Sequence, residues 1–317
     1  MGQLHASIGK GIEKGRNVRH AFRICFVLIS CIVVTTLLTC RVSLGKGLRF
    51  RDGVGGVNVA HTIVENDSLV EMARRYDVGY NEISDANPGV DPFIPRVGTR
   101  VTIPGRWILP DVPRRRGIVV NIAERRLYFF PPHRNHLVDT FPVGIGDEGW
   151  ETPVGTYRIV EKLVHPSWYV PASIRRQKPE LPKVVPPGPD NPLGDYALRL
   201  SIGTVLIHGT NRPFGIGRRV SHGCIHLYPE DIAALYRMVK CGTRVTIVRQ
   251  RVKAVLVNGK VLVEIHGGEG RLLQQEAIQV LEKKGLLGRV DMGLLLAALK
   301  SASGMPVDVS KVAATAG

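Results

Sequence analysis

Three histidines and one cysteine lie within the short stretch IHGTNRPFGIGRRVSHGCIHL, which runs from Ile207 to Leu227. A thiol attacks a carbonyl carbon only as the thiolate, so a nucleophilic cysteine needs a base within hydrogen-bond reach. His208 ends a predicted strand that can hold its imidazole rigidly, and Gly223 lets the backbone turn tightly before Cys224. The N–H groups of Gly223 and Cys224 are suited to an oxyanion hole. These residues therefore predict an acyl-transfer site with Cys224 as nucleophile and His208 as its base.

The same loop allows two other interpretations. His208, His222, Cys224 and His226 are all credible zinc ligands. The stretch has neither a C-x-x-C nor an H-E-x-x-H spacing, so we expect no metal here. A buried, inert cysteine is the commonest role for this residue type. The density of Gly, Ser and His around Cys224 favours the nucleophile instead.

The composition is that of a folded, basic protein. The chain has 317 residues, 44% of them hydrophobic, and a formal net charge of +16. Such a charge suits an anionic partner such as nucleic acid, a membrane surface or an acidic polymer. No nucleic-acid-binding motif is present, so we expect no nucleic acid partner. Outside the N-terminal apolar run the cysteines are Cys224 and Cys241, which do not make a disulfide framework, although one bridge between them stays open.

The N-terminus has the pattern of an export signal. Five basic residues between Lys10 and Arg23 precede ICFVLISCIVVTTLLTC, which ends at Cys40 and contains no charge. A basic stretch followed by an apolar run is typical of a signal peptide or a signal anchor. Residues 1–41 are therefore predicted to lead the chain across, or tether it to, the inner membrane.

Residues 57–104 have the pattern of a small β-α-α-β unit. VAHTIV alternates like a strand, and NDSLVEMARRYDV is expected to be a helix capped by Asn66 or Asp67 with Leu69, Met72, Ala73 and Tyr76 on one face. GYNEISDANPG predicts a second short helix, and GTRVTIP a second strand. The preceding residues 41–58 are rich in Gly and Arg and are interpreted as a linker.

Residues 117–248 are expected to be mainly β with one or two helices. GIVVNIAERRLYFFPP predicts a hairpin that turns at Ala123–Arg125, and HLVDTFPVGIG, GTYRIVEKLV, YALRL, TVLIHG and GTRVTIV predict further strands. PEDIAALYRMV predicts a helix after the cysteine loop. The proline-rich segment 179–195 cannot be a helix or an interior strand, and its length makes it a candidate lid or substrate-binding loop.

Residues 252–317 are interpreted as an α+β C-terminal subdomain without a chemical motif. KAVLVNGKVLVEIH predicts a hairpin with an Asn-Gly turn. RLLQQEAIQVLEKKG and DMGLLLAALKSA predict two helices.

Two resemblances give these segments a function. HTIVENDSLVEMARRYDVGYNEISDANPGV with GTRVTIP resembles a LysM module, which implies binding to N-acetylglucosamine-containing glycans such as peptidoglycan. IHGT, FGIG and VSHGCI, with the sixteen-position step from His208 to Cys224, resemble the signature of the YkuD-type L,D-transpeptidases of bacterial cell walls. ETPVGTYRIV and PSWYVPASI extend that resemblance, which implies a β-sandwich catalytic domain over residues 117–248.

The resemblance implies a mechanism and residue roles. Cys224 attacks the third residue of a peptidoglycan tetrapeptide stem, D-Ala leaves, and the acyl-enzyme passes to an amine of another stem or of an outer-membrane lipoprotein. The implied mechanism needs no cofactor. The Gly209 carbonyl orients His208, while His222 and Gly223 line the acyl site. Ser221 and His226 are assigned to substrate binding, and the substrate places the domains in the periplasm. We also expect that removing the LysM-like unit spares acylation of Cys224.

One position departs from the family pattern. The family usually carries Arg after HGCI, where this chain has His226. Arg is always charged, whereas His titrates near pH 6.5 unless perturbed, so we expect a pH-dependent contribution between pH 5 and 7. Two alternatives stay open: a hydrolase that cuts the same bond with water, and a non-catalytic peptidoglycan-binding protein.

Overall fold

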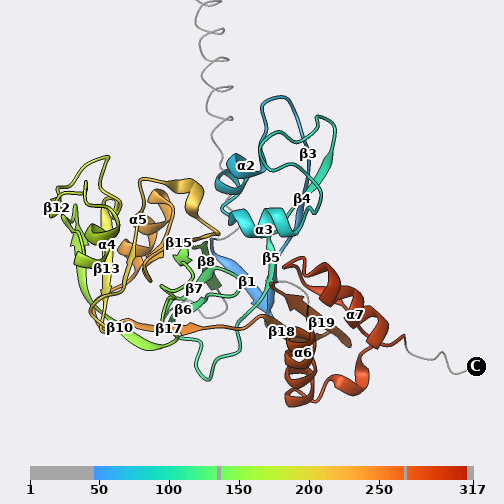
Figure 1. Ribbon diagram of the computed structural model, residues 1–317. Coiled ribbons are helices and arrows are strands. Elements are labelled where there is room, and N and C mark those ends of the chain that lie inside the picture. Colours follow the sequence, from blue (N-terminus) through green and yellow to red (C-terminus); the bar gives the residue numbers. More distant parts are fainter. Residues whose placement is uncertain (1–45, 134–136, 268–269, 313–317) are drawn as a thin grey trace, which may run out of the picture. The chain divides into compact units, whose positions relative to one another are not determined.

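The computed structural model describes residues 46–133, 137–267 and 270–312, and its fold is mostly β, as expected (Figure 1). Among these residues the largest sheet has eleven strands. In spatial order they are β16 (Ile225–His226), β14 (Leu206–His208), β13 (Tyr196–Leu200), β10 (Gly155–Val164), β17 (Arg244–Val248), β6 (Gly117–Asn121), β7 (Arg126–Phe130), β8 (Leu137–Pro142), β1 (Leu48–Arg51), β2 (Val54–Gly56) and β5 (Arg106–Ile108).

The hairpin β6–β7 is buried on both faces, which explains why each strand carries a continuous apolar run, residues 118–120 in β6 and 127–130 in β7. Ile118 and Leu127 belong to the core that continues into β10, β13 and β17. Val119 and Tyr128, on the opposite face, belong to a second core that includes the LysM-like unit. The predicted turn is confirmed, and Arg125 adopts a positive φ of 58° in it. The hairpin therefore joins two cores through the alternation of its side chains.

Residues 207–227, which carry the predicted nucleophile Cys224, lie at one edge of this sheet. Strand β14 pairs in parallel with β16, so that His208 lies beside His226. Short strand β15 (Arg219–Ser221) pairs with β9 (Ile145–Gly146), and the 3-10 turn η1 (Pro213–Gly215) precedes it. Helix α5 (Pro229–Met238) follows β16 and packs on β13.

The proline-rich segment 179–195 is largely irregular, as its composition predicts. Its two-residue strand β12 (Val184–Val185) pairs with β11 (Trp168–Tyr169). The short helix α4 (Ala172–Gln177) lies between them in the chain.

The LysM-like unit has the predicted β-α-α-β order. It consists of β3 (Val59–Thr62), α2 (Leu69–Arg75), α3 (Tyr80–Asp85) and β4 (Arg100–Ile103), with β3 paired to β4. The predicted helix cap is wrong, because Ser68 caps α2 by accepting a hydrogen bond from the Glu71 N–H. The Asp67 carboxylate is held instead by His61 at 2.7 Å and by the Val64 N–H at 3.1 Å.

The expected linker 41–58 is wrong for its described part, which starts at residue 46. Strand β1 pairs with β8, and β2 pairs with β5, so this segment extends the main sheet. Leu48 and Phe50 alternate with Arg49 and Arg51 and pack on the core of the LysM-like unit. Inward apolar and outward basic residues alternate here as in an ordinary strand, but the overall content of arginine and glycine suggested a linker.

The C-terminal region has its own core, formed by a hairpin and two helices. Its elements are β18 (Val252–Val257), β19 (Lys260–Ile265), α6 (Arg271–Lys283), η2 (Leu287–Arg289), α7 (Met292–Ser301) and β20 (Val307–Asp308). The predicted Asn-Gly turn is confirmed, since Asn258 and Gly259 both have positive φ, 50° and 78°.

The predicted signal segment, residues 1–41, lies outside the described residues. Across the part that is described, we find no helix with the length and apolarity needed to span a bilayer.

Candidate active site

His208 sits at the end of β14 and is almost fully buried. Its Nδ1 lies 2.7 Å from the Gly209 carbonyl oxygen. A carbonyl oxygen only accepts, so Nδ1 carries the proton and Nε2 keeps its lone pair. Burial lowers the pKa of His208 to about 4, against the raising effect of the Gly209 and Leu193 carbonyls. His208 is therefore a neutral base at neutral pH.

The backbone around Gly209 is closely packed against the end of the proline-rich segment. A Cβ on Gly194, which has φ of +65°, would lie 3.2 Å from the Gly209 Cα and 3.1 Å from the Thr210 nitrogen. Asn191 fixes that end, because its Nδ2 donates to the Pro166 carbonyl at 2.8 Å and its Oδ1 accepts from the Leu193 N–H at 2.9 Å. The predicted lid segment is thus anchored next to His208 at its C-terminal end.

Cys224 follows a turn that the buried Ser221 side chain stabilises by hydrogen bonds. The Ser221 hydroxyl donates to the Cys224 carbonyl at 2.6 Å and accepts from the Gly223 N–H at 3.2 Å. Gly223 has φ of +100°, a conformation that L side chains rarely adopt. The Ser221 side chain is buried, so the structure places this predicted substrate contact within the turn.

The Cys224 thiol is partly covered and is not oxidised to a disulfide. Both Cys224 and Cys241 are free, and Cys241 is exposed. The Sγ atom lies 3.9 Å from the Thr204 carbonyl oxygen, to which the thiol donates. Burial raises the pKa of Cys224, opposed by the Leu206 backbone and by the charge of Arg199. The cysteine is therefore a protonated thiol at neutral pH, and its activation depends on proton transfer.

His226 lies against the ring of His208, with 4.4 Å between the ring centroids. Its backbone is held by Gly144 through two hydrogen bonds of 2.9 Å. Burial, together with the neighbouring His208, lowers the pKa of His226 well below its usual value. The prediction that His226 titrates between pH 5 and 7 is therefore wrong, because it assumed a solvated imidazole.

His222 occupies the outer rim of the site. Its ring is exposed and lies 4.8 Å from the ring of Trp150. Its Nε2 is 3.4 Å from Oε1 of Gln177, at the end of α4. Sequence reasoning missed Trp150 and Gln177, which contact His222, and Arg199, whose charge acts on Cys224, because nothing in their local sequence shows these contacts.

Ligand atoms with metal-binding spacing lie elsewhere in the described part of the chain. Glu124, Glu264 and His266 are all buried and bring such atoms within 4.8 Å of one another. The Lys253 ammonium already lies among them, in contact with Glu124 and 2.6 Å from Glu264 Oε1. The proposed zinc ligands of the cysteine loop are separated, since His222 points to the rim while His208 and His226 stack inside.

Sequence reasoning assigned no chemistry to the C-terminal hairpin and so missed this buried cluster. A usable signal was present, because the Asn-Gly turn fixes the register that places Lys253 opposite Glu264. Two opposite charges on one cross-strand pair, among the apolar residues of the hairpin, indicate a buried ion pair.

Comparisons with known proteins identify two domains in the chain. The L,D-transpeptidase catalytic domain model (YkuD) matches residues 115–247, and the LysM domain model matches residues 61–104. Probable L,D-transpeptidase YcfS of Escherichia coli (strain K12) is 42% identical over 274 residues, which cover 81% of this chain and 85% of that protein. Probable L,D-transpeptidase YbiS of the same strain is 40% identical over 269 residues, covering 80% and 87%.

A solved L,D-transpeptidase from Mycobacterium tuberculosis H37Rv aligns with 42% of this chain and 57% of that one, at 21% identity and a TM-score of 0.32. This partial superposition adds nothing to the assignment. The family assignment rests on the two E. coli relatives, because each is matched over more than four-fifths of its own length. The chain belongs to the L,D-transpeptidase family of enzymes, and it carries a LysM domain beside the catalytic one.

Proposed function

We propose that the chain is a periplasmic cell-wall L,D-transpeptidase in which Cys224 forms an acyl-enzyme on a peptidoglycan tetrapeptide stem. The observation that carries the proposal is that Cys224 directly precedes β16, which pairs with the strand carrying His208, so a protonated thiol and a neutral, fixed imidazole lie on neighbouring segments. His208 keeps a lone pair on Nε2 because its Nδ1 proton is committed to the Gly209 carbonyl. Such a base accepts the thiol proton as sulfur attacks, so no thiolate has to exist beforehand.

One proton moves from the thiol to His208 and then to the leaving group during the reaction. The Cys224 sulfur adds to the carbonyl carbon of the third stem residue while His208 takes the thiol proton. The Cys224 N–H is the oxyanion donor we assign, since the Gly223 N–H is held by Ser221. The imidazolium returns its proton to the departing D-Ala nitrogen, which leaves a thioester on Cys224. An amine attacks that thioester and restores the thiol, giving a cross-link between stems or an anchored lipoprotein.

The LysM domain supports a wall substrate and suggests where glycan is held. Its β3–α2 loop and its α3–β4 loop are joined by a hydrogen bond from the Leu69 N–H to the Pro92 carbonyl, 2.9 Å long. Exposed apolar side chains gather on these loops, including Val64, Phe93 and Ile94. An aromatic ring exposed in this way is suited to stacking on a sugar face. We assign this patch to glycan binding.

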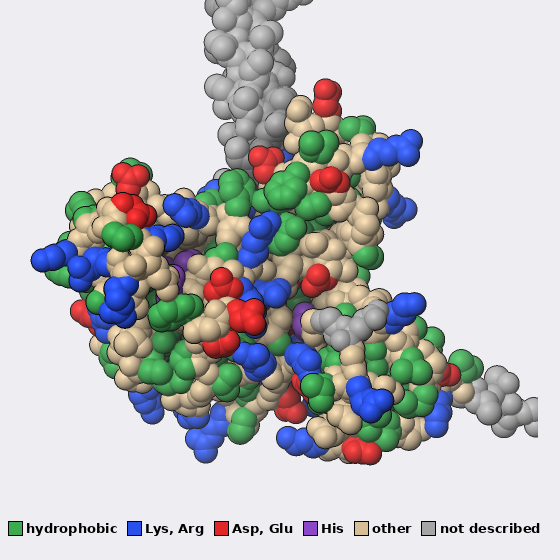
Figure 2. All heavy atoms as spheres, in the orientation of Figure 1, with side chains coloured by type: hydrophobic (Ala, Val, Ile, Leu, Met, Phe, Trp, Pro, Cys, Tyr) green, Lys and Arg blue, Asp and Glu red, His purple; other side chains and the backbone are tan. Residues whose placement is uncertain are grey.

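Charge and export are consistent with the same location. Figure 2 shows Lys and Arg side chains spread over the visible face, in keeping with the net charge of +16. Such a surface attracts anionic stem peptides at low ionic strength. The basic and apolar N-terminal segment is the export signal that a periplasmic substrate requires.

Intact-protein mass spectrometry with a carbapenem-type β-lactam tests the nucleophile. The wild type and the matched Cys241→Ala control should gain one adduct, whereas Cys224→Ala should gain none. An adduct on the Cys224→Ala protein would contradict the assignment. Muropeptide products formed with and without an acceptor amine then separate transfer from hydrolysis.

Pelleting with purified peptidoglycan tests the wall-binding assignment. Phe93→Ser should reduce the pelleted fraction, because it removes the exposed ring without touching the core. Unchanged pelleting of Phe93→Ser would move wall binding to the basic catalytic domain.

A further inference from the structure

Helix α3 of the LysM domain holds the chain that leads into the cysteine loop. The Tyr80 N–H donates to the Ile216 carbonyl at 3.1 Å. Gly79 and Gly217 meet without side chains, and a Cβ on Gly217 would lie 2.3 Å from the Tyr80 nitrogen. The Arg218 guanidinium lies 3.7 Å from the centre of the Tyr80 ring, within the range of a cation–π contact.

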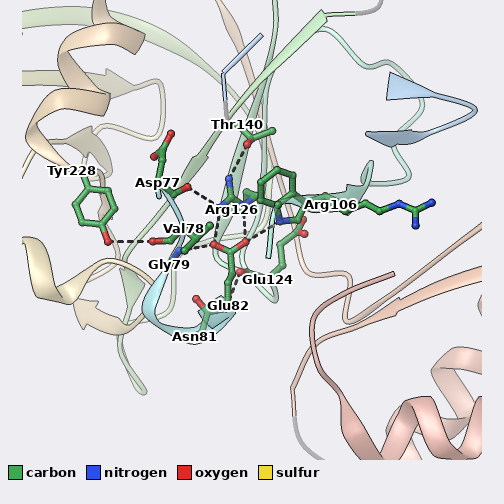
Figure 3. Close-up of polar contacts among 12 residues, drawn as sticks. Asp77, Val78, Gly79, Asn81, Glu82, Arg106, Glu124, Arg126, Thr140 and Tyr228 are labelled. Atoms are coloured by element: carbon green, nitrogen blue, oxygen red, sulfur yellow. Dashed lines mark hydrogen bonds and ion pairs between the residues drawn. The ribbon is translucent and has the colours of Figure 1, made fainter. Parts of the chain in front are cut away.

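The chain that leaves the cysteine loop is held by the same domain. The Tyr228 hydroxyl donates to the Val78 carbonyl at 3.2 Å, as Figure 3 shows. Arg74 of α2 binds Glu230 through two hydrogen bonds of 3.0 Å and faces the Tyr228 ring. Cys224 lies six residues after Arg218 and four before Tyr228. The nucleophile is therefore placed between two anchors on the LysM domain.

A buried ion pair fixes α3 to the main sheet. The Arg126 side chain, from β7, is fully buried and donates to both Glu82 carboxylate oxygens at 2.7 Å (Figure 3). Glu82 also accepts from the Gly79 N–H at 2.6 Å and from the Trp107 indole at 3.0 Å. A carboxylate with this many partners has one position, so Gly79 and Tyr80 are held in place against the cysteine loop.

We propose that the LysM domain is a positioning element for Cys224 in addition to any role in wall binding, with Tyr80 as the key positioning residue. The Tyr80 ring holds the Arg218 side chain, and from Arg218 onward the path is short and consists of backbone contacts. The Arg218 carbonyl accepts a hydrogen bond from the Ile145 N–H at 3.0 Å, and the Ser221 carbonyl accepts one from the Asp147 N–H at 2.8 Å. Ser221 then sets the turn that carries Cys224. The inference rests on the proposed function only for its enzymatic assay.

This arrangement corrects the expectation that removal of the LysM-like unit spares acylation. Deleting residues 57–104 would remove Glu82, the partner of Arg126, and would take away the apolar side chains that share a core with Val119 and Tyr128, both of which are costly for the fold. It would also remove both anchors of the cysteine loop. Domain deletion therefore cannot separate wall binding from catalysis, and point substitutions are needed.

Tyr80→Ala and Tyr80→Phe form the test pair in the full chain. Alanine removes the ring under Arg218, whereas phenylalanine keeps it. We expect the rate constant for Cys224 acylation by a carbapenem-type β-lactam to fall about tenfold in Tyr80→Ala, a loss within the range of a desolvated cation–π contact. The half-saturating β-lactam concentration should change little, because the ring does not touch the ligand. Tyr80→Phe should restore the wild-type rate, and peptidoglycan pelleting should stay intact in both.

Val309→Ala, in the C-terminal core, is the matched control for general destabilisation. It should lower the melting temperature and leave the acylation rate constant at 25 °C unchanged. A wild-type rate in Tyr80→Ala, or an equal slowing in Val309→Ala, would overturn the inference.

A second readout does not depend on transpeptidase chemistry. Should the wild type form no β-lactam adduct, the proposed function fails, but alkylation of the Cys224 thiol by iodoacetamide still reports its position. We expect Tyr80→Ala to change that alkylation rate severalfold and Tyr80→Phe to leave it unchanged. Equal rates in all three proteins would refute the positioning role.

Discussion

Two groups of buried titratable side chains are held in opposite ways. In the active site, Cys224, His208 and His226 are neutral: the first two are hydrogen-bonded to backbone carbonyls, and the rings of the two histidines are in contact. At the C-terminal hairpin, the Lys253 ammonium contacts two buried carboxylates, the Ile108 carbonyl at 2.6 Å and the Tyr128 hydroxyl at 3.3 Å. The active-site group leaves the His208 base free to react. In the hairpin cluster, the lysine cation is paired with the carboxylates.

The difference shows what burial does in each case. Burial lowers the pKa of His208 to about 4 and raises that of Cys224, so neither forms an ion until a substrate develops charge. At the hairpin, burial raises the pKa of Glu124 and Glu264, while Lys253 opposes that shift. Buried ionised groups that are paired stabilise one arrangement of the chain, whereas buried neutral groups with a free lone pair can act as catalysts.

Removing the cation of the hairpin cluster should have the largest effect. Lys253→Met leaves Glu124 and Glu264 adjacent and without their lysine cation, which should cost about 3–5 kcal/mol of unfolding free energy. The carboxylates can escape by binding protons, so the folded variant should bind more protons than the unfolded chain above about pH 4.5. Its stability should therefore fall as the pH rises from about 5 to 8. Urea unfolding at several pH values measures both effects.

Lys260→Met is the matched control on the same hairpin. Lys260 pairs with Asp308 at 2.8 Å, but its side chain is 65% exposed. We expect a change within about 0.5 kcal/mol and no added pH dependence. Equal losses in the two variants would mean that Lys253 is no more buried in solution than Lys260.

Sequence reasoning predicted the individual elements well, because each carries its own local signal. Strands β10 and β13 begin and end where their alternation does, and the Asn-Gly dipeptide fixes the C-terminal hairpin. The catalytic pair could be proposed for a similar reason, since Ser221 and Gly223 shape the turn before Cys224 from adjacent positions.

What could not be predicted depends on contacts between distant segments. Glu82 and Arg126 are 44 positions apart, and neither has a local pattern that reveals the partner. The strand β1 was missed because its partner β8 lies about 90 residues later, and because Arg49 and Arg51, which alternate with Leu48 and Phe50, resembled a linker. The neutral state of His226 depends on its packing against His208, and no sequence spacing could show that contact.

The pH dependence of acylation should sharpen the contrast between the two groups. His208 has to be unprotonated to take the thiol proton, and its pKa is about 4. The rate constant for carbapenem-type acylation should therefore stay level from about pH 7 to 5 and reach half its value near pH 4. A midpoint near pH 6.5 would show that the imidazole is solvated. Far-UV circular dichroism at each pH controls for unfolding.

Alkylation of Cys224 by iodoacetamide gives the complementary curve. That reaction needs the thiolate and no general base. Burial raises the pKa of Cys224, so alkylation should rise only above the usual thiol value of about 8.5. Fast alkylation at pH 6 would mean that a thiolate–imidazolium pair exists at rest, which would remove the distinction between the two groups.

The smallest effect concerns His226, where this chain departs from the arginine usual in the family. Its pKa lies well below its usual value because the ring is buried against His208, so it carries no charge between pH 5 and 7. Glutamine keeps a neutral polar side chain there without a titratable group. The pH–rate curves of the wild type and His226→Gln should therefore have the same shape in this window, with rate constants within about twofold of each other, a difference below about 0.5 kcal/mol. An inflection near pH 6.5 that is present in the wild type and lost in His226→Gln would show that His226 titrates. The active site would then hold a charge of its own, as the hairpin cluster does.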